Sequence, residues 1–194
     1  MLCENCLRKF ENRSRSVQRG HLSGYALCEF DDDLSLALSA FKERGQFAMA
    51  RLLVDELLGQ SQLERLRAFG AEALVSISSS KASFAKRGFS PAQIVASSLG
   101  RRLGLPTMGK ALQLNRVTED QASLTVDARA TNLVGAMTCS TSVADRRVLL
   151  VDDVVTTGAS VIEAARAVEA RDGRVVGFFA IAETLLRISA PNEK

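Results

Sequence analysis

The sequence predicts an α/β protein in which helices flank a central, mainly parallel sheet. Residues 148–151 are four consecutive apolar residues, which is typical of a strand buried on both faces of a parallel sheet. A helical pattern follows this strand, because apolar side chains recur there at helical spacing, at Val161, Ala164, Ala165 and Val168. A second apolar run, at residues 73–77, also precedes a helical pattern, so the order of strand and helix repeats along the chain.

The composition favours one domain with a small appendage. The chain has 194 residues, 46% of them hydrophobic, and a net charge of +3, which is too mild to indicate bulk nucleic-acid binding. No leader with a charged and then an apolar segment opens the sequence, and no apolar run approaches the roughly 18 residues of a membrane span. We therefore expect a soluble, cytoplasmic protein without membrane insertion.

Residues 1–24 form a Cys-containing arm in this interpretation, and residues 25–190 form the main domain. The polar and basic composition of residues 8–24 indicates a weakly structured linker, either solvated or in contact with nucleic acid. A structural zinc site needs four ligands, and Cys3 and Cys6 supply a single C-x-x-C pair. His21 and Cys28 are the nearby candidates for the other two ligands. The sequence thus leaves open a zinc site or a flexible arm with reduced thiols.

Two helices are expected between residues 31 and 58. The acidic residues that begin at Asp31 favour a helix N-terminus, and Leu34, Leu38 and Phe41 then share one face. Gly45 breaks this helix, and residues 47–58 form the second one. Their apolar faces are expected to cover the sheet or its ligand cleft.

The segment after the strand at residues 73–77 is a candidate anion site. It is a loop of small residues with basic side chains, and the candidate ligands are Ser79, Ser80, Lys81 and Arg87. A solvated basic loop is the alternative. Ser90 and Pro91 then start a helix that Gly104 ends.

The remaining elements are a strand at residues 111–114, a long polar stretch and a last strand at residues 174–182. The polar stretch up to Gly135 has little apolar periodicity, which is typical of a mobile lid. Residues 104–110 match G-x-x-x-x-G-K, but Ala111 stands where a P-loop needs Ser or Thr, so we exclude a P-loop.

The sharpest candidate site follows the strand at residues 148–151. Asp152 and Asp153 come at its carboxyl end, where open α/β sheets place their ligands. The small residues from Thr156 to Ser160 let backbone amides close around an anion at a helix N-terminus. Carboxylates suit the vicinal hydroxyls of a sugar, so ribose 5-phosphate fits both halves of the motif. The alternative is a strand, an acidic turn and a capped helix that bind nothing.

Three segments resemble a known family. Residues 148–160 resemble the phosphoribosyl pyrophosphate (PRPP) motif of type I phosphoribosyltransferases, and residues 86–93 resemble the RRGFNQA signature of ComF-like competence proteins. A further pattern of that family is matched by Arg116, Gln121, Leu124, Arg129 and Asn132. The chain departs from the family in two places: a four-cysteine zinc finger is reduced to Cys3 and Cys6, and serines replace prolines at positions 78 and 80.

The resemblance implies a type I phosphoribosyltransferase fold for residues 25–190 and a degenerate zinc-finger-like arm before it. It implies Mg²⁺-dependent transfer of phosphoribose from PRPP to an unknown acceptor, with Asp152 and Asp153 holding the ribose and, through its hydroxyls, Mg²⁺. The substrate-binding residues would be Val154, Val155, Thr156, Thr157, Gly158, Ala159 and Ser160, with Ser79, Ser80, Lys81 and Arg87 at the pyrophosphate.

The resemblance further implies a role in DNA uptake beside a helicase-like partner. Zinc would be a second metal, with Cys3, Cys6, His21 and Cys28 as its candidate ligands. The alternative function is a non-catalytic adaptor that binds a nucleotide or single-stranded DNA.

Overall fold

The structure, a computed structural model, describes residues 13–32, 34–35, 38–39, 53–78, 80–115, 133–139 and 143–184. Several residues named above lie outside this part of the chain: Cys3, Cys6, Phe41, Ser79, Arg116, Gln121, Leu124, Arg129 and Asn132.

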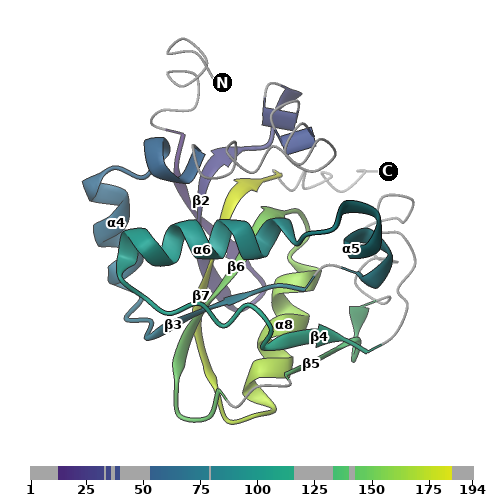
Figure 1. The fold of residues 1–194 in the computed structure, drawn as a ribbon. Coiled ribbons are helices and arrows are strands. Elements are labelled where there is room, and N and C mark those ends of the chain that lie inside the picture. The colour runs from purple at the N-terminus through teal and green to yellow at the C-terminus, as the bar shows by residue number, and fades with distance from the viewer. Residues whose placement is uncertain are drawn as a thin grey trace, which may run out of the picture.

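A five-stranded sheet in the order β1-β2-β7-β6-β3 forms the centre of the molecule (Figure 1). Strand β3 (Ala73–Ser76) pairs in parallel with β6 (Arg147–Val155), and β6 pairs in parallel with β7 (Arg174–Glu183). Strand β2 (Leu22–Glu29) continues the parallel order, and β1 (Arg15–Arg19) runs antiparallel at the edge. The expected mainly parallel sheet is confirmed.

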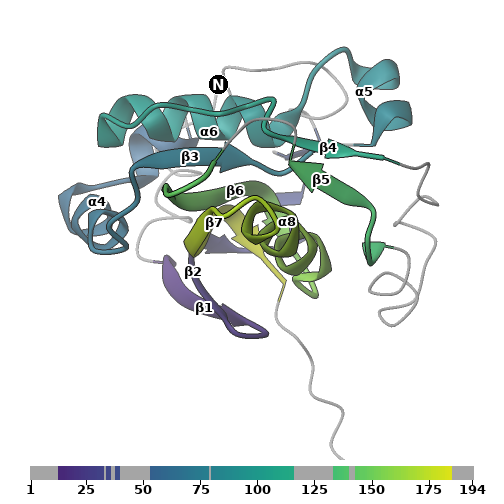
Figure 2. The ribbon, with the colours of Figure 1, turned by 90° about the horizontal axis from the view of Figure 1, so that it is seen from below.

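Helices cover both faces of the sheet, with α6 (Pro91–Leu103) and α8 (Ala159–Glu169) on opposite sides (Figure 2). Alternate residues of β6 supply the two cores. Leu149 and Val151 pack with the α6 side, whereas Val148 and Leu150 pack with the α8 side. Burial on both faces explains why this strand reads as a continuous apolar run.

The helix ends follow the predicted signals. Ser90 caps α6 by accepting a hydrogen bond from the Gln93 amide, and Gly104 ends the helix with φ +73°. Asp31 likewise accepts from the Leu34 amide at 2.9 Å. The apolar faces expected of the helices within residues 31–58 are buried at the positions that the structure describes, which include Leu34, Leu38, Leu53, Val54 and Leu57. Helix α4 (Gln60–Arg67), which follows them, was not expected.

A second, two-stranded antiparallel sheet pairs β4 (Leu112–Leu114) with β5 (Met137–Cys139). The strand expected at residues 111–114 is confirmed, whereas the three-residue β5 was not expected. Glu163 of α8 accepts a hydrogen bond from the Met137 amide at 2.9 Å, and Arg166 donates to the Met137 carbonyl at 2.8 Å. These bonds attach α8 to β5.

The expectation of a weakly structured linker over residues 8–24 is wrong from Arg15 onward. Residues 15–24 belong to the β1–β2 hairpin, and the expected domain boundary after residue 24 falls inside β2. Val17 and Leu22 are buried against the α8 side of the sheet, and this burial holds the hairpin in place. In the part of the chain that the structure describes, no helix is long and apolar enough to cross a membrane.

Candidate functional site

Asp152 and Asp153 lie within β6, which runs on to Val155, past the apolar run at residues 148–151 that predicted the strand. The strand continues to Val155 because Val154 and Val155 pair with Ala182 and Glu183 of β7. Both carboxylates are half-buried, and the Asp153 amide donates to Asp152 Oδ1 at 2.9 Å. The two acids therefore sit near the carboxyl end of a central parallel strand, where ligands of such sheets bind.

The tight turn expected after these acids is present. Gly158 takes the left-handed conformation, with φ +86°, and is the N-cap of α8. The first intrahelical bond runs from the Ile162 amide to the Gly158 carbonyl, so the amides of Ala159, Ser160 and Val161 precede it. The Ala159 amide lies 3.3 Å from Thr157 Oγ1. Gly158 supplies no side-chain cap to this helix start, although the Thr157 hydroxyl accepts the Ala159 amide, and helix starts attract anions.

Sequence reasoning missed Arg19, which holds the turn from the hairpin side. Its side chain is 5% exposed, and its Nε donates to the Thr156 carbonyl at 2.7 Å. Its Nη2 donates to Glu183 Oε2 and to the Thr184 carbonyl, both at 2.9 Å. Arg19 and Glu183 are 164 positions apart, so no local pattern could have paired them.

The segment after β3 differs from the expected loop, because Lys81 to Arg87 form helix α5 (Lys81–Arg87). The Ser80 hydroxyl caps this helix by accepting from the Ser83 amide at 3.1 Å, and the Ser78 hydroxyl donates to the Leu112 carbonyl. Arg87 is half-buried in the last turn, and only the backbone of Lys81 is described.

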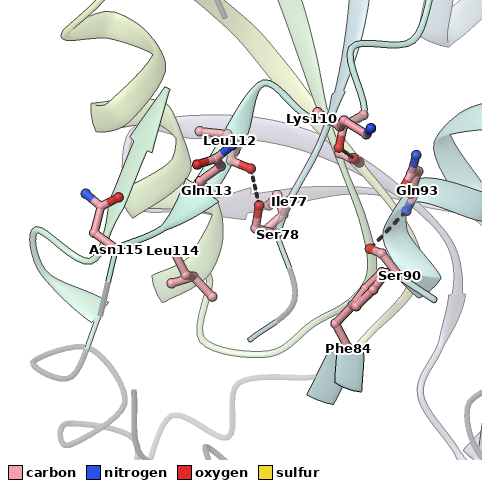
Figure 3. Close-up of a pocket in the computed structure, with 12 residues that line it drawn as sticks. Ile77, Ser78, Phe84, Ser90, Gln93, Lys110, Leu112, Gln113, Leu114 and Asn115 are labelled. Atoms are coloured by element: carbon pink, nitrogen blue, oxygen red, sulfur yellow. Dashed lines mark hydrogen bonds between the residues drawn. The ribbon is translucent and has the colours of Figure 1, made fainter. Parts of the chain in front are cut away.

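A cavity of about 510 Å³ opens beside β3 (Figure 3). Its wall residue Ile77 donates its amide proton to the carbonyl of Val151, the residue before Asp152. Lys110 is the charged side chain among the described lining residues, and no carboxylate is among them. The cavity is lined by Ser76, Ile77, Ser78, Phe84, Ser90, Gln93, Gly109, Lys110, Leu112, Gln113, Leu114 and Asn115. It thus adjoins the strand of the acidic pair but does not contain the pair.

The two expected zinc ligands within the described residues, His21 and Cys28, do not come together. His21 is exposed in the β1–β2 turn and Cys28 is buried near the other end of β2, about 20 Å away along an extended strand. Burial also raises the pKa of the Cys28 thiol to about 12, which disfavours the thiolate that zinc needs. A site that uses both His21 and Cys28 is therefore wrong.

Metal ligands are also sparse in the rest of the described chain. Within the described ranges, no cluster of three or more His, Cys, Asp and Glu side chains could hold a metal ion. Two neighbouring carboxylates suit Mg²⁺ only where substrate oxygens complete its shell, as they do in many phosphate-binding sites.

Several basic residues of the N-terminal segment are neutralised by acids. Arg13 pairs with Asp31, Arg15 pairs with Glu29 at 2.9 Å, and Arg19 pairs with Glu183. These ion pairs lower the positive charge that the hairpin offers to a nucleic acid.

Comparison with known proteins gives three kinds of similarity. The model of the phosphoribosyl transferase domain matches residues 82–192, more than half of the chain. Competence protein F of Haemophilus influenzae is 28% identical over 168 residues, which cover 83% of this chain and 69% of that protein. The DNA utilization protein YhgH of Escherichia coli O157:H7 is 27% identical over 187 residues, or 94% of this chain and 78% of that protein. The solved adenine phosphoribosyltransferase of Leishmania donovani is 12% identical, with a TM-score of 0.43, over 97% of this chain and 86% of that one.

Proposed function

Because the chain belongs to the phosphoribosyltransferase domain family, as a ComF-like member, we propose that it binds PRPP and transfers phosphoribose to an acceptor. One observation carries the proposal: a helix start whose N-cap is a glycine follows two half-buried carboxylates on a central parallel strand. This order places an anion site one turn away from acceptors for sugar hydroxyls.

The 5-phosphate end of PRPP is assigned to the turn after β6. The early amides of α8 and the hydroxyls of Thr156, Thr157 and Ser160 donate to the phosphate oxygens. Small residues let the phosphate approach the backbone closely, and the positive end of the α8 dipole favours its charge. Val154 and Val155 position this turn through their pairing with β7.

The ribose is assigned to Asp152 and Asp153, which accept hydrogen bonds from its hydroxyls. In the transfer, the bond between ribose C1 and the pyrophosphate oxygen breaks, pyrophosphate keeps the electron pair, and the acceptor forms a new bond to C1. Positive charge develops on the ribose meanwhile, and nearby carboxylates stabilise it.

The pyrophosphate end is assigned to the side of β3. Lys110 and the neutral polar lining of the cavity suit an anion, and the absence of carboxylates among the lining residues avoids repulsion. Ser79, Ser80, Lys81 and Arg87 remain the proposed contacts on the α5 side. Asp152 and Asp153 would hold Mg²⁺ through the sugar, and the ion would supply the charge that neutralises the leaving group.

A second candidate function is a cytoplasmic adaptor for DNA uptake that binds a nucleotide or single-stranded DNA beside a helicase-like partner. The names of the two bacterial relatives favour it, since they refer to competence and to DNA utilization. The ion pairs of Arg13, Arg15 and Arg19 count against the hairpin as the DNA-binding surface.

Titration calorimetry with PRPP and Mg²⁺ separates the two functions. The double variant Asp152→Asn, Asp153→Asn should weaken PRPP binding by about 100-fold, because two charge-assisted hydrogen bonds are lost. The matched control is Asp145→Asn, Asp172→Asn, which makes the same charge change at two exposed turn positions with φ near +60° that Asn also tolerates. Equal PRPP affinity in both double variants would contradict the proposal, and oligonucleotide binding that neither variant changes would favour the adaptor.

A further inference from the structure

Arg19 is a buried cation whose hydrogen bonds converge on the turn after β6. Val17 and Arg19 are the buried residues of β1, while Ser16 and Gln18 are not buried, so strand alternation points Arg19 toward the α8 side of the sheet. From there the guanidinium reaches Thr156, Glu183 and Thr184. Three segments distant in sequence thus meet at one side chain.

The charge of Arg19 is matched within the protein. Its Nη2 lies 2.9 Å from Glu183 Oε2, and the side chains of the pair are 5% and 6% exposed. A buried cation needs such a partner, because desolvation makes an unpaired one costly. Nε and Nη1 also donate to backbone carbonyls, those of Thr156 and Gln18. The guanidinium is therefore occupied with fixing the chain and is not directed at a ligand.

The bond to Thr156 sets the direction of the next amide. The peptide between Thr156 and Thr157 is trans, so its C=O and N–H point in opposite directions. With the carbonyl held by Arg19, the Thr157 N–H points away from the hairpin. This is the orientation that an anion at the turn requires.

The aliphatic stem of Arg19 constrains the same turn by contact. A Cβ added at Gly158 would lie 2.5 Å from Arg19 Cβ and 2.8 Å from Arg19 Cγ. The chain can pass this close because residue 158 is glycine, which also tolerates its φ of +86°. Arg19 therefore fixes the turn at Thr156 by a hydrogen bond and at Gly158 by packing.

We infer that Arg19, held by Glu183, is a positioning residue that pre-organises the turn at residues 156–160 for a sugar 5-phosphate. The inference rests on the proposed function, since it assigns the role of Arg19 within that site. Arg19 acts through the turn and does not touch the substrate. Its loss should weaken recognition of the 5-phosphate selectively and leave the pyrophosphate end unaffected.

The test compares two probes, ribose 5-phosphate and Mg²⁺-pyrophosphate, by titration calorimetry on the full chain. Arg19→Met keeps the stem but removes the donors, and should weaken ribose 5-phosphate binding by about tenfold while Mg²⁺-pyrophosphate affinity changes by less than about twofold. Arg19→Lys keeps the charge and one donor group and should recover part of the loss. Arg13→Met is the matched control and should bind both probes as the unmodified protein does, since Arg13 pairs with Asp31 and not with Glu183 or the turn.

A purely structural role would give a different result. It would lower the thermal midpoint and the fraction of binding-competent protein, and would leave the dissociation constant of the folded fraction unchanged for both probes. That result, or an Arg19→Met variant with unmodified affinity for ribose 5-phosphate, overturns the inference. If Arg19→Met does not fold, the same comparison is made with Arg19→Lys.

The proposed function is tested separately in the same experiment. If the unmodified protein binds neither ribose 5-phosphate nor PRPP, the proposed function falls and the inference falls with it. If Asp152→Asn, Asp153→Asn abolishes PRPP binding while Arg19→Met and Arg19→Lys do not weaken ribose 5-phosphate, the inference alone falls.

Discussion

The turns after β6 and after β3 follow neighbouring parallel strands, and each leads into a helix, but the two helix starts are capped differently. After β3, the Ser80 hydroxyl accepts the Ser83 amide and so fills part of the first turn of α5. After β6, the cap is Gly158, which has no side chain to offer the first amides of α8. The Thr157 hydroxyl accepts the Ala159 amide, so the glycine cap leaves the Ser160 and Val161 amides to a ligand, whereas the serine cap uses its own oxygen.

The two turns also differ in how the rest of the protein holds them. The turn after β6 is fixed by a buried arginine from a distant strand, while Ser78 and Ser80 are fixed by bonds to Leu112 and Ser83. Helix α8 has 11 residues and is bonded to β5, whereas α5 has seven. The comparison favours the turn after β6 as the stronger of the two proposed anion sites.

The largest effect is expected from Gly158→Ala, with Gly88→Ala as its matched control. Both glycines have left-handed φ, +86° and +75°, but a Cβ meets Arg19 at 2.5 Å in the first case and nothing within 4 Å in the second. Gly88→Ala should cost about 1 kcal/mol of unfolding free energy from backbone strain alone. Gly158→Ala should cost about 3 kcal/mol, because overpacking is added to the same strain. Urea unfolding measures both, and equal costs would contradict the close packing of Arg19 on the turn.

The next largest effect is expected from Glu163→Gln, which tests the attachment of α8 to β5. Burial alone would raise the pKa of Glu163, but hydrogen bonds from Arg166 and from the amides of Met137 and Gly135 hold that pKa below its usual value. Glu163→Gln should therefore lower the free energy of unfolding by about 1.5 kcal/mol at pH 7. This figure allows for the half-exposed side chain of Arg166.

This loss should depend on pH in a defined direction. Because the pKa of Glu163 is lower in the folded protein than in the unfolded chain, ionised Glu163 stabilises the fold. This stabilisation is fully present above the pKa in the unfolded chain, about 4.3, and disappears as pH falls through the pKa in the folded protein. The difference in unfolding free energy between the unmodified protein and Glu163→Gln should thus shrink progressively as pH falls below the unfolded pKa in denaturant titrations. Glu72→Gln is the control, because its pKa is also lowered, by the Arg147 amide, but the side chain is exposed and the loss should be smaller. A pH-independent difference at Glu163 would contradict the account.

Ser80→Ala tests the other helix start. Removing the cap of α5 should cost about 1 kcal/mol of unfolding free energy. Thermal unfolding is a sufficient measurement, with Ser97→Ala as the control, because the Ser97 hydroxyl is exposed and bonds within its own helix. If Ser80→Ala is no less stable than Ser97→Ala, Ser80 does not act as the cap.

The smallest effect is expected from Arg15→Met. Arg15 pairs with Glu29 at 2.9 Å and lies 3.6 Å from Glu183, but its side chain is 36% exposed and such pairs contribute less than about 1 kcal/mol. Urea unfolding measures both variants. Arg19→Met should lower the free energy of unfolding by more than Arg15→Met does, because it leaves Glu183 buried without its closest partner. Equal costs would mean that burial does not distinguish these two arginines.

The elements that the sequence predicted are those whose signals are local. The apolar runs of β3 and β6, the Ser90-Pro91 start of α6 and the helical spacing within α8 each depend on neighbouring residues. The PRPP-like motif was predicted for the same reason, since strand, acids, small-residue turn and helix are contiguous. The prediction ended this strand at Val151, before Asp152 and Asp153, because the pairing with β7 that extends β6 to Val155 is a non-local contact.

The features that escaped prediction are made by distant partners. Residues 15–19 read as a basic linker because Val17 is their single apolar residue, and Glu29 and Glu183, which neutralise Arg15 and Arg19, lie far along the chain. The cavity beside β3 escaped for a similar reason, since its lining comes from β3, α5, α6 and β4 and the segments around them.

A crystal structure of the full chain with PRPP and Mg²⁺ tests the central claim most directly. The account predicts the 5-phosphate within hydrogen-bonding distance of the amides at residues 157–160, with the ribose hydroxyls on Asp152 and Asp153. A PRPP molecule bound elsewhere, with the turn after β6 empty, would contradict it.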